Sequence, residues 1–283
     1  MTTFRRRLAT VLCTLAATCT VATVPHASAA PNAFVAFGDS IMANPTVDGW
    51  FMSKVTAGSS GSSGSSDVDI NRGCATDRNG LAKQAAARLG MAAWDYSCPG
   101  ATAHSGGKVF ATQINEAIAD GALDASTRVV VIQIGINDTH AAYTKSIPAD
   151  VLHNNYVSTM VPEIQRIRQA APHAQIKMIG YPSITDNNYT VCLAQWGFNL
   201  HTIEALPMAT HFENQAEAMQ RDVAQRTGIQ FVDVRAQSMG HGMCASDEQR
   251  WMGAFIDLGA ARNMPVHLTD NGKAQVARII AES

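Results

Sequence analysis

Four short segments of the chain carry groups that could together perform nucleophilic catalysis. An apolar run at residues 34–37 leads into Gly38-Asp39-Ser40, which is how a buried strand delivers one serine to the start of a helix. Later segments hold Gly100, Asn137 and His267. A serine hydroxyl is too weakly acidic to attack an ester unaided, so it needs a neutral imidazole within hydrogen-bond reach. We therefore expect His267 to act as the base for Ser40.

The elements that must position these groups follow an alternating pattern. Apolar runs and amphipathic stretches alternate along the chain, as is typical of strand–helix–strand units around a parallel sheet. The predicted strands are Ala33–Phe37, Ala92–Ser97, Arg128–Gly135, Gln175–Tyr181 and Ile229–Val234. The predicted helices are Gly80–Leu89, Val109–Ala119, Ala149–Ala170, Ala205–Arg226 and Thr269–Glu282. The sequence therefore predicts an α/β fold with a mainly parallel sheet.

Three of the candidate groups lie directly after predicted strands. Ser40, Gly100 and Asn137 each follow the carboxyl end of such a strand. Catalytic groups of open α/β sheets gather at that edge, so we expect the three to meet there. Of the two aspartates that flank them, Asp39 is expected to brace its turn through backbone hydrogen bonds, and Asp138 to be a helix-start residue.

The same residues carry a resemblance to a known family. Gly38-Asp39-Ser40, Gly100, Gly135-Ile136-Asn137-Asp138 and His267 resemble, in order, the four blocks of the SGNH hydrolases, also called GDSL esterases and lipases. The likeness spans nearly the whole chain after its first thirty residues, and it is strongest to secreted bacterial members. It implies a three-layer α/β/α sandwich around a mainly parallel five-stranded sheet, with residues 30–283 forming a single domain.

The resemblance also implies an activity and roles. The expected reaction is hydrolysis of carboxylic esters of acyl lipids or small esters through an acyl-enzyme on Ser40. The main-chain N–H groups of Ser40 and Gly100 and the side-chain amide of Asn137 would form the oxyanion hole. Glycine lets backbone approach the substrate closely, and an asparagine amide donates without carrying charge. No metal or organic cofactor is required.

One position departs from the family pattern. Most members carry an aspartate three residues before the histidine, where this chain has Met264. Similar secreted esterases replace that carboxylate by a main-chain carbonyl, so the resemblance implies that the carbonyl of Met264 orients His267. Asp257 and Asp270 are the side-chain alternatives, although Asp270 follows Thr269 at a predicted helix start and fits a capping position.

The first residues predict export from the cell. Arg5, Arg6 and Arg7 precede an apolar stretch, and Ala27-Ser28-Ala29 fits a small-residue cleavage site, so residues 1–29 are expected to be a secretory signal peptide. The predicted location is extracellular or in the cell envelope, without a stable membrane anchor. A net charge of −2 with scattered basic residues argues against nucleic-acid binding, and a monomer is the default expectation.

Four cysteines remain after the expected signal peptide. Cys74, Cys98, Cys192 and Cys244 imply two disulfides in an exported protein. Three pairings are possible, and we favour Cys74 with Cys98 and Cys192 with Cys244 because each pair joins sequence neighbours. The family resemblance supports the first pair. A zinc site is the alternative, but the chain has no Cys-x-x-Cys spacing.

Two segments and two other functions complete the expectations. The glycine–serine run Gly58–Ser66 is expected to be a flexible surface loop, and the irregular stretch Thr185–Leu206 to be a lid, an aromatic wall of the pocket or a plain surface loop. Methionines near His267 could line an acyl-chain groove. The alternative functions are a cell-envelope acyltransferase that uses the same site, and a non-catalytic secreted binding protein built on a hydrolase scaffold.

Overall fold

The structure is a computed structural model that describes residues 32–55, 67–186, 189–260 and 264–283. The expected signal peptide, residues 1–29, lies outside the described residues. The same holds for the whole glycine–serine run, Gly58–Ser66, because the description stops at residue 55 and resumes at residue 67.

A five-stranded parallel sheet forms the centre of the fold. Its strands, in spatial order, are β11 (Gln230–Val232), β6 (Gln175–Ile179), β5 (Thr127–Gln133), β1 (Ala33–Gly38) and β4 (Ala92–Asp95). The strand that the sequence marks as central, β5, pairs with β1 on one side and with β6 on the other. Because all the pairings are parallel, the carboxyl ends of these strands share one edge of the sheet.

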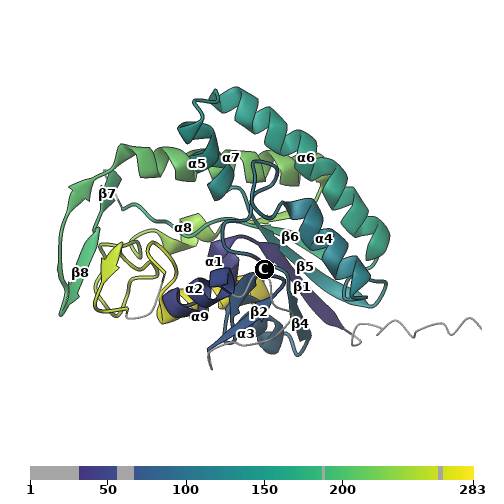
Figure 1. The fold of residues 1–283 in the computed structure, drawn as a ribbon, viewed down its shortest axis with the longest axis horizontal. Helices are drawn as coiled ribbons and strands as arrows, with labels where there is room; N and C mark the ends of the chain where they lie inside the picture. The colour runs from purple at the N-terminus through teal and green to yellow at the C-terminus, as the bar shows by residue number, and fades with distance from the viewer. Residues whose placement is uncertain (1–31, 56–66, 187–188, 261–263) are drawn as a thin grey trace, which may run out of the picture.

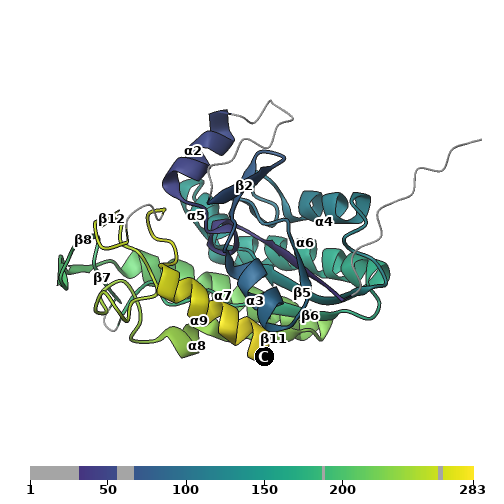
Figure 2. The same cartoon turned by 90° about the horizontal axis from the view of Figure 1, so that it is seen from below.

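Helices cover both faces of this sheet (Figures 1 and 2). Along β1 the side chains alternate, so that Val35 and Phe37 enter one core and Phe34 and Ala36 enter the other. The first core is closed by α4 (Phe110–Ala119), α6 (Ala149–Ala170) and α7 (Pro207–Thr227). The second is closed by α3 (Leu81–Arg88) and α9 (Asp270–Glu282). The predicted three-layer α/β/α architecture is confirmed.

The predicted strands and long helices are all present, with shifted ends. The helix α6 has the predicted bounds, whereas β4, β5 and β6 each stop two residues before their predicted ends. The residues beyond those ends remain apolar or buried, but they already belong to turns that lead toward the site. Hydrophobicity alone cannot separate a strand residue from a buried turn residue.

Several short elements were not predicted. They are α1 (Ser40–Ala43), α2 (Val47–Val55), α5 (Ile136–Thr144), α8 (Val234–Ser238) and the antiparallel hairpin of β2 (Val68–Asn71) and β3 (Cys74–Asp77). The stretch Thr185–Leu206, outside residues 187–188, contains β7 (Thr190–Val191), β8 (Ala194–Gly197), β9 (Leu200–His201) and β10 (Glu204–Ala205). A distant strand, β12 (Ile256–Asp257), pairs in parallel with β8. These elements are too short for a clear apolar period.

Both favoured disulfides are formed. Cys74 in β3 is bonded to Cys98 in the loop after β4, and Cys192 is bonded to Cys244. The two disulfides close chain segments of 24 and 52 residues and so lower the entropy of the unfolded chain. In the loop-entropy account, each stabilises the folded protein by about 3 to 4 kcal/mol.

None of the helices in the described part of the chain is both long enough and apolar enough to cross a membrane.

Candidate active site

The end of β1 presents Ser40 in a tightly held turn. Gly38 is required there, because a Cβ at this position would lie 2.6 Å from the main-chain oxygen of Gln133. The N–H of Asp39 donates to the same oxygen of Gln133 at 3.0 Å. The Asp39 carboxylate in turn accepts from the N–H of Ile41 at 3.0 Å and caps α1, as expected. Ser40 is therefore the first residue of a short, fixed helix.

A buried tyrosine ties this turn to the segment after β5. The hydroxyl of Tyr181, just past β6, donates to Asp39 Oδ2 and accepts from the N–H of Ile136 at 3.1 Å. Burial raises the pKa of Asp39 to about 7, against the lowering effect of the hydrogen bonds from Tyr181 and Ile41. The hydroxyl of Tyr181 therefore joins the segments that follow β1, β5 and β6.

The segment Ile136-Asn137-Asp138 holds the loop that carries Gly100. Asn137 Nδ2 donates to the carbonyl of Ala101 at 2.9 Å, which orients its amide. The fully buried carboxylate of Asp138, in the first turn of α5, accepts from the N–H of Ala103 at 2.8 Å and from the hydroxyl of Ser105 at 2.7 Å, so it braces this loop. Gly100 itself has a φ of +82°, a conformation that side chains other than glycine rarely adopt.

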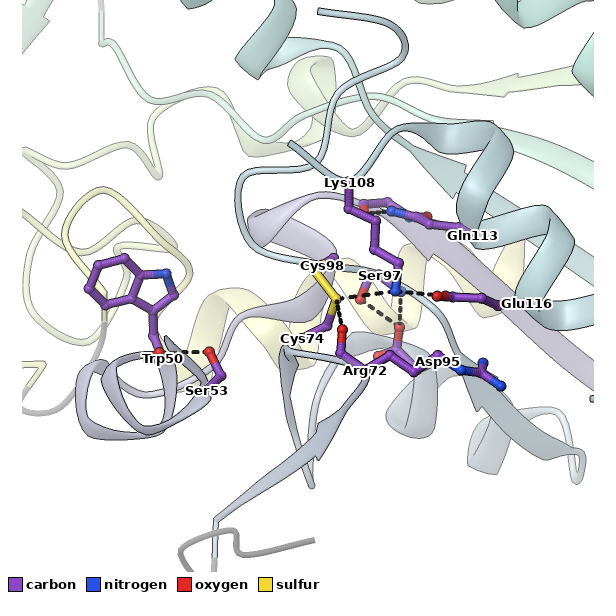
Figure 3. Close-up of a disulfide and its surroundings, with 11 residues drawn as sticks. Trp50, Ser53, Arg72, Cys74, Asp95, Ser97, Cys98, Lys108, Gln113 and Glu116 are labelled. Atoms are coloured by element: carbon purple, nitrogen blue, oxygen red, sulfur yellow. Dashed lines mark hydrogen bonds and ion pairs between the residues drawn. A yellow bond between two sulfur atoms is a disulfide. The ribbon is translucent and has the colours of Figure 1, made fainter. Parts of the chain in front are cut away.

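The first disulfide fixes the same loop at Cys98 (Figure 3). Cys98 lies two residues before Gly100 and is bonded to Cys74. Lys108 Nζ lies 3.4 Å from Cys74 Sγ and 2.6 Å from a carboxylate oxygen of Glu116. The Gly100 loop is therefore anchored both by the disulfide and by the segment after β5.

The histidine is oriented by a main-chain carbonyl, but not by the expected one. His267 Nδ1 lies 2.7 Å from the carbonyl oxygen of Pro265, so the expectation of the Met264 carbonyl is wrong by one residue. The reason is the backbone at Val266, whose φ of +61° turns the chain back and brings the ring over the carbonyl two residues before it. A β-branched residue rarely adopts this conformation.

The other ring nitrogen of His267 is free to act as a base. Nε2 is buried and has no hydrogen-bond partner among the described residues, Ser40 Oγ included. Burial lowers the pKa of His267 below 6.5, while the contact with the Pro265 carbonyl raises it by less. The ring is therefore neutral at pH 7, with an unpaired lone pair on Nε2.

The two carboxylates that could have replaced the missing aspartate are engaged elsewhere. Asp257 pairs with the buried Arg250 and accepts from the N–H of Ala254 at 2.8 Å. These bonds hold the pKa of Asp257 below its usual value despite burial. Asp270 lies in the first turn of α9, 2.8 Å from Lys273. Neither carboxylate contacts His267. The N-cap of α9 is Thr269 and not Asp270, which differs from the expectation.

The side chain of Asn44 connects the helix that starts at Ser40 to the loop that carries His267. Asn44 Oδ1 accepts from the N–H of Leu268 at 3.0 Å, and Asn44 Nδ2 donates to the carbonyl of Leu268 at 3.1 Å. The main-chain N–H of Asn44 donates to the carbonyl of Ser40 at 2.8 Å. Through this amide, the helix that starts at Ser40 is fastened to the residue directly after His267.

Ser40 and His267 line one pocket of about 380 Å³. Its polar residues are Ser40, Asn137, His140, Tyr181 and His267, and its other residues are Ile41, Ile136, Pro182, Ile184, Val191, Leu193, Leu206, Ala209, Phe212, Met243, Met252 and Val266. Two of the methionines near the histidine do line it, as expected. The cavity suits an apolar chain attached to one polar reacting group.

The segment Thr185–Leu206 supplies one wall of this pocket through Val191, Leu193 and Leu206. It therefore forms a pocket wall, but an aliphatic one, because neither Trp196 nor Phe198 lines the pocket as an aromatic wall would require. His140 also lines the pocket, whereas His104 lies against Asp138, with 3.4 Å between ring nitrogen and carboxylate oxygen.

Comparison with known proteins identifies the family of the chain. Residues 36–275 match the sequence profile of the GDSL-like Lipase/Acylhydrolase family. The chain belongs to this family. It is accordingly a carboxylic ester hydrolase. No curated protein sequence matches the chain significantly.

Solved structures of similar fold include several ester hydrolases. Phospholipase A1 from Streptomyces albidoflavus NA297 is 20% identical, with a TM-score of 0.56 over 88% of this chain and 99% of that one. The extracellular lipase from Streptomyces rimosus is 16% identical, with a TM-score of 0.55 over 87% and 98%. A carbohydrate esterase family 2 enzyme from Corynascus thermopiles is 17% identical, with a TM-score of 0.52 over 92% and 67%. At these identities the likeness concerns the fold.

Two supporting residues of this GDSL hydrolase were missed from the sequence. Tyr181 follows a predicted strand at the active edge, so its position was a usable signal. Asn44 precedes a proline, which marks a helix stop but says nothing of its contact with Leu268, 224 residues away. Among the described residues, no group of three or more histidine, cysteine, aspartate or glutamate side chains is arranged to hold a metal ion.

Proposed function

We propose that the protein hydrolyses carboxylic esters of acyl lipids or small acyl esters, with Ser40 as nucleophile and His267 as general base. The observation that carries the proposal is the pocket. It brings Ser40, Asn137 and His267 together in a cavity whose other walls are mostly apolar. Such a site can bind an acyl chain while its polar groups act on the carbonyl carbon.

In the first step, His267 Nε2 takes the proton of the Ser40 hydroxyl as its oxygen attacks the ester carbonyl. The contact with Pro265 supports this role, because an Nδ1–H that donates to a carbonyl leaves Nε2 as the basic nitrogen. The lowered pKa of His267 keeps that nitrogen unprotonated at neutral pH. A neutral carbonyl fixes the ring but stabilises the imidazolium less than a carboxylate would.

The oxyanion of the tetrahedral intermediate would be met by the N–H groups of Ser40 and Gly100 and by the Asn137 amide. Neither main-chain N–H donates to another described residue. Asn137 uses one amide hydrogen on Ala101 and keeps the second. Each such donor is worth about 10²- to 10³-fold in kcat in comparable hydrolases. Collapse then releases the alcohol with the proton from His267, and water hydrolyses the acyl-enzyme by the same route.

We further propose that the chain acts outside the cytoplasm as one hydrolase domain, residues 30–283, after removal of residues 1–29. The two disulfides support an oxidising compartment. An acyl-lipid substrate is supported by the apolar pocket and by the names of two proteins of similar fold, a phospholipase A1 and a lipase.

The test is hydrolysis of a series of p-nitrophenyl acyl esters by the wild type and by Ser40→Ala. We expect the wild type to prefer medium or long acyl chains and Ser40→Ala to lose activity by several orders of magnitude while folding normally. Equal rates would refute the proposal and leave a non-catalytic binding protein. Adding glycerol and analysing the products separates hydrolysis from acyl transfer, because a transferase would form the glycerol ester in preference to free acid.

A further inference from the structure

A group of large apolar side chains is left exposed on the small sheet of β12, β8 and β9. We call it the hairpin patch, and it consists of Trp196, Phe198, Leu200, Phe255, Ile256 and Leu258, each at least half exposed. The sheet projects at the end of the molecule opposite α4 (Figures 1 and 2). Contiguous exposed apolar side chains usually mark a site that binds a protein or a membrane.

The strand register explains the exposure of three of these side chains. Asp257 pairs with Gln195 across β12 and β8, and both turn inward, Asp257 onto Arg250 and Gln195 onto the carbonyl of Met243. Their neighbours along each strand must therefore turn outward. The outward-facing neighbours are Trp196, Ile256 and Leu258.

The hairpin turn places an aromatic ring where folding gains nothing from it. Phe198 and Asn199 connect β8 to β9 with φ values of +55° and +58°. Two-residue turns of this kind favour asparagine and glycine, and a bulky residue there is strained. Phe198 is also 93% exposed, so it contributes almost no burial to the fold. Strained residues of this kind point to a role outside folding.

The hairpin patch is continuous with the pocket, and the segment that carries its hairpin has no lysine or arginine side chain, while Arg250 beside β12 is buried and paired with Asp257. The carbonyl of Leu193, a pocket-lining residue, accepts from the N–H of Ile256 at 2.9 Å. A main-chain hydrogen bond therefore joins the pocket wall to the hairpin patch. The sequence has no lysine or arginine between Lys177 and Arg221. This segment therefore has no positive charge to attract anionic lipids. Burial of its apolar side chains is the interaction that it can offer to a lipid surface.

We propose that the hairpin patch docks the enzyme onto an electrically neutral lipid surface, with Phe198 and Trp196 entering the interface. Aromatic side chains are well suited to the boundary between lipid and water. Docking would place the pocket wall formed by Leu193 beside the lipid that supplies the ester. This inference deepens the proposed function, on which it rests, by naming the physical form of the substrate.

The test measures binding separately from catalysis. The Ser40→Ala protein is mixed with sucrose-loaded phosphatidylcholine vesicles, and the sedimented fraction is determined together with the shift of tryptophan fluorescence. We expect binding that depends little on salt and that does not increase when phosphatidylglycerol is added. In the same background, Phe198→Gly should weaken binding by about tenfold or more, from the loss of one buried ring.

Two controls keep the result interpretable. Phe198→Gly suits the positive φ, so its melting temperature should equal or exceed that of the parent, and lost binding cannot be ascribed to unfolding. Ile118→Ser, at an exposed apolar position on the distant α4, should leave binding unchanged.

Several results would overturn the docking proposal. They are no binding to neutral vesicles, binding that requires anionic lipid, equal losses in Phe198→Gly and Ile118→Ser, or a protein dimer that Phe198→Gly dissociates. Hydrolysis of a soluble short-chain ester without vesicles tests the proposed function by itself. In a protein that keeps Ser40, Phe198→Gly should hydrolyse the soluble ester at the wild-type rate.

Discussion

The contact between Asn44 and Leu268 gives a sharp test of how the site is held together. Replacing Asn44 by glycine removes both hydrogen bonds to the Leu268 main chain but keeps a residue that accepts the positive φ of +38° at this position. Leu268 is completely buried, so water would not fully replace the two hydrogen bonds that its main chain loses. The expected loss of stability is about 2 to 4 kcal/mol.

That loss should appear both in unfolding and in turnover. For a domain of this size the melting temperature should fall by roughly 5 to 15 °C. The kcat for a soluble ester should fall by about 10- to 100-fold at temperatures where the variant is folded, because a displacement of about 1 Å in a catalytic group has effects of that size. Calorimetry and steady-state kinetics, with circular dichroism to confirm folding, measure the two effects.

A matched control is available in Asn199. It also has a positive φ, and its side chain accepts one hydrogen bond, from the N–H of Asp247 at 2.8 Å in an exposed loop. Asn199→Gly should therefore leave kcat unchanged. If Asn44→Gly lowers the melting temperature but leaves kcat at the wild-type value, Asn44 stabilises the fold without positioning His267, and the reasoning is refuted.

Three further predictions follow from the same geometry. The pKa of His267 is lowered and the base must be neutral, so kcat/KM should fall as pH decreases, with a midpoint below 6.5; a midpoint at or above 6.5 would contradict the burial of the ring. Tyr181→Phe leaves two buried atoms without their hydrogen-bond partner, the N–H of Ile136 and Oδ2 of Asp39, and should cost about 2 to 4 kcal/mol in urea unfolding; a loss under about 1 kcal/mol would argue against the bridge. Replacing Cys74 and Cys98 by serine should cost about 3 kcal/mol and lower kcat, and a variant with unchanged kcat would show that the disulfide does not hold the oxyanion loop.

The sequence was sufficient to predict the strands and long helices that bury a whole face. The β-branched run in β5 and the amphipathic periods of α6 and α9 each reflect the environment of a complete strand or helix, so their type could be predicted. Placing Ser40 and Asn137 at strand ends needed only the rule that the carboxyl ends of parallel strands share one edge.

The remaining parts depend on contacts between distant residues. The hydrogen bonds of Asn44 to Leu268 and of Tyr181 to Asp39 join residues 224 and 142 positions apart, and nothing local in the sequence marks them. The choice of the Pro265 carbonyl over that of Met264 depends on the positive φ of Val266, which a β-branched residue does not lead one to expect. Local propensity cannot predict a conformation that the surrounding fold imposes.

The most direct test of the central claim is covalent labelling with an alkyl fluorophosphonate, followed by mass spectrometry of the digested protein. Attack by Ser40 Oγ on phosphorus would form a P–O bond and release fluoride, with the hydroxyl proton taken up by His267. We predict one adduct, on the peptide that carries Ser40, that is absent in Ser40→Ala, greatly slowed in His267→Ala, and matched by full loss of ester hydrolysis. An adduct at another residue, or hydrolysis that persists after Ser40 is fully labelled, would contradict the account.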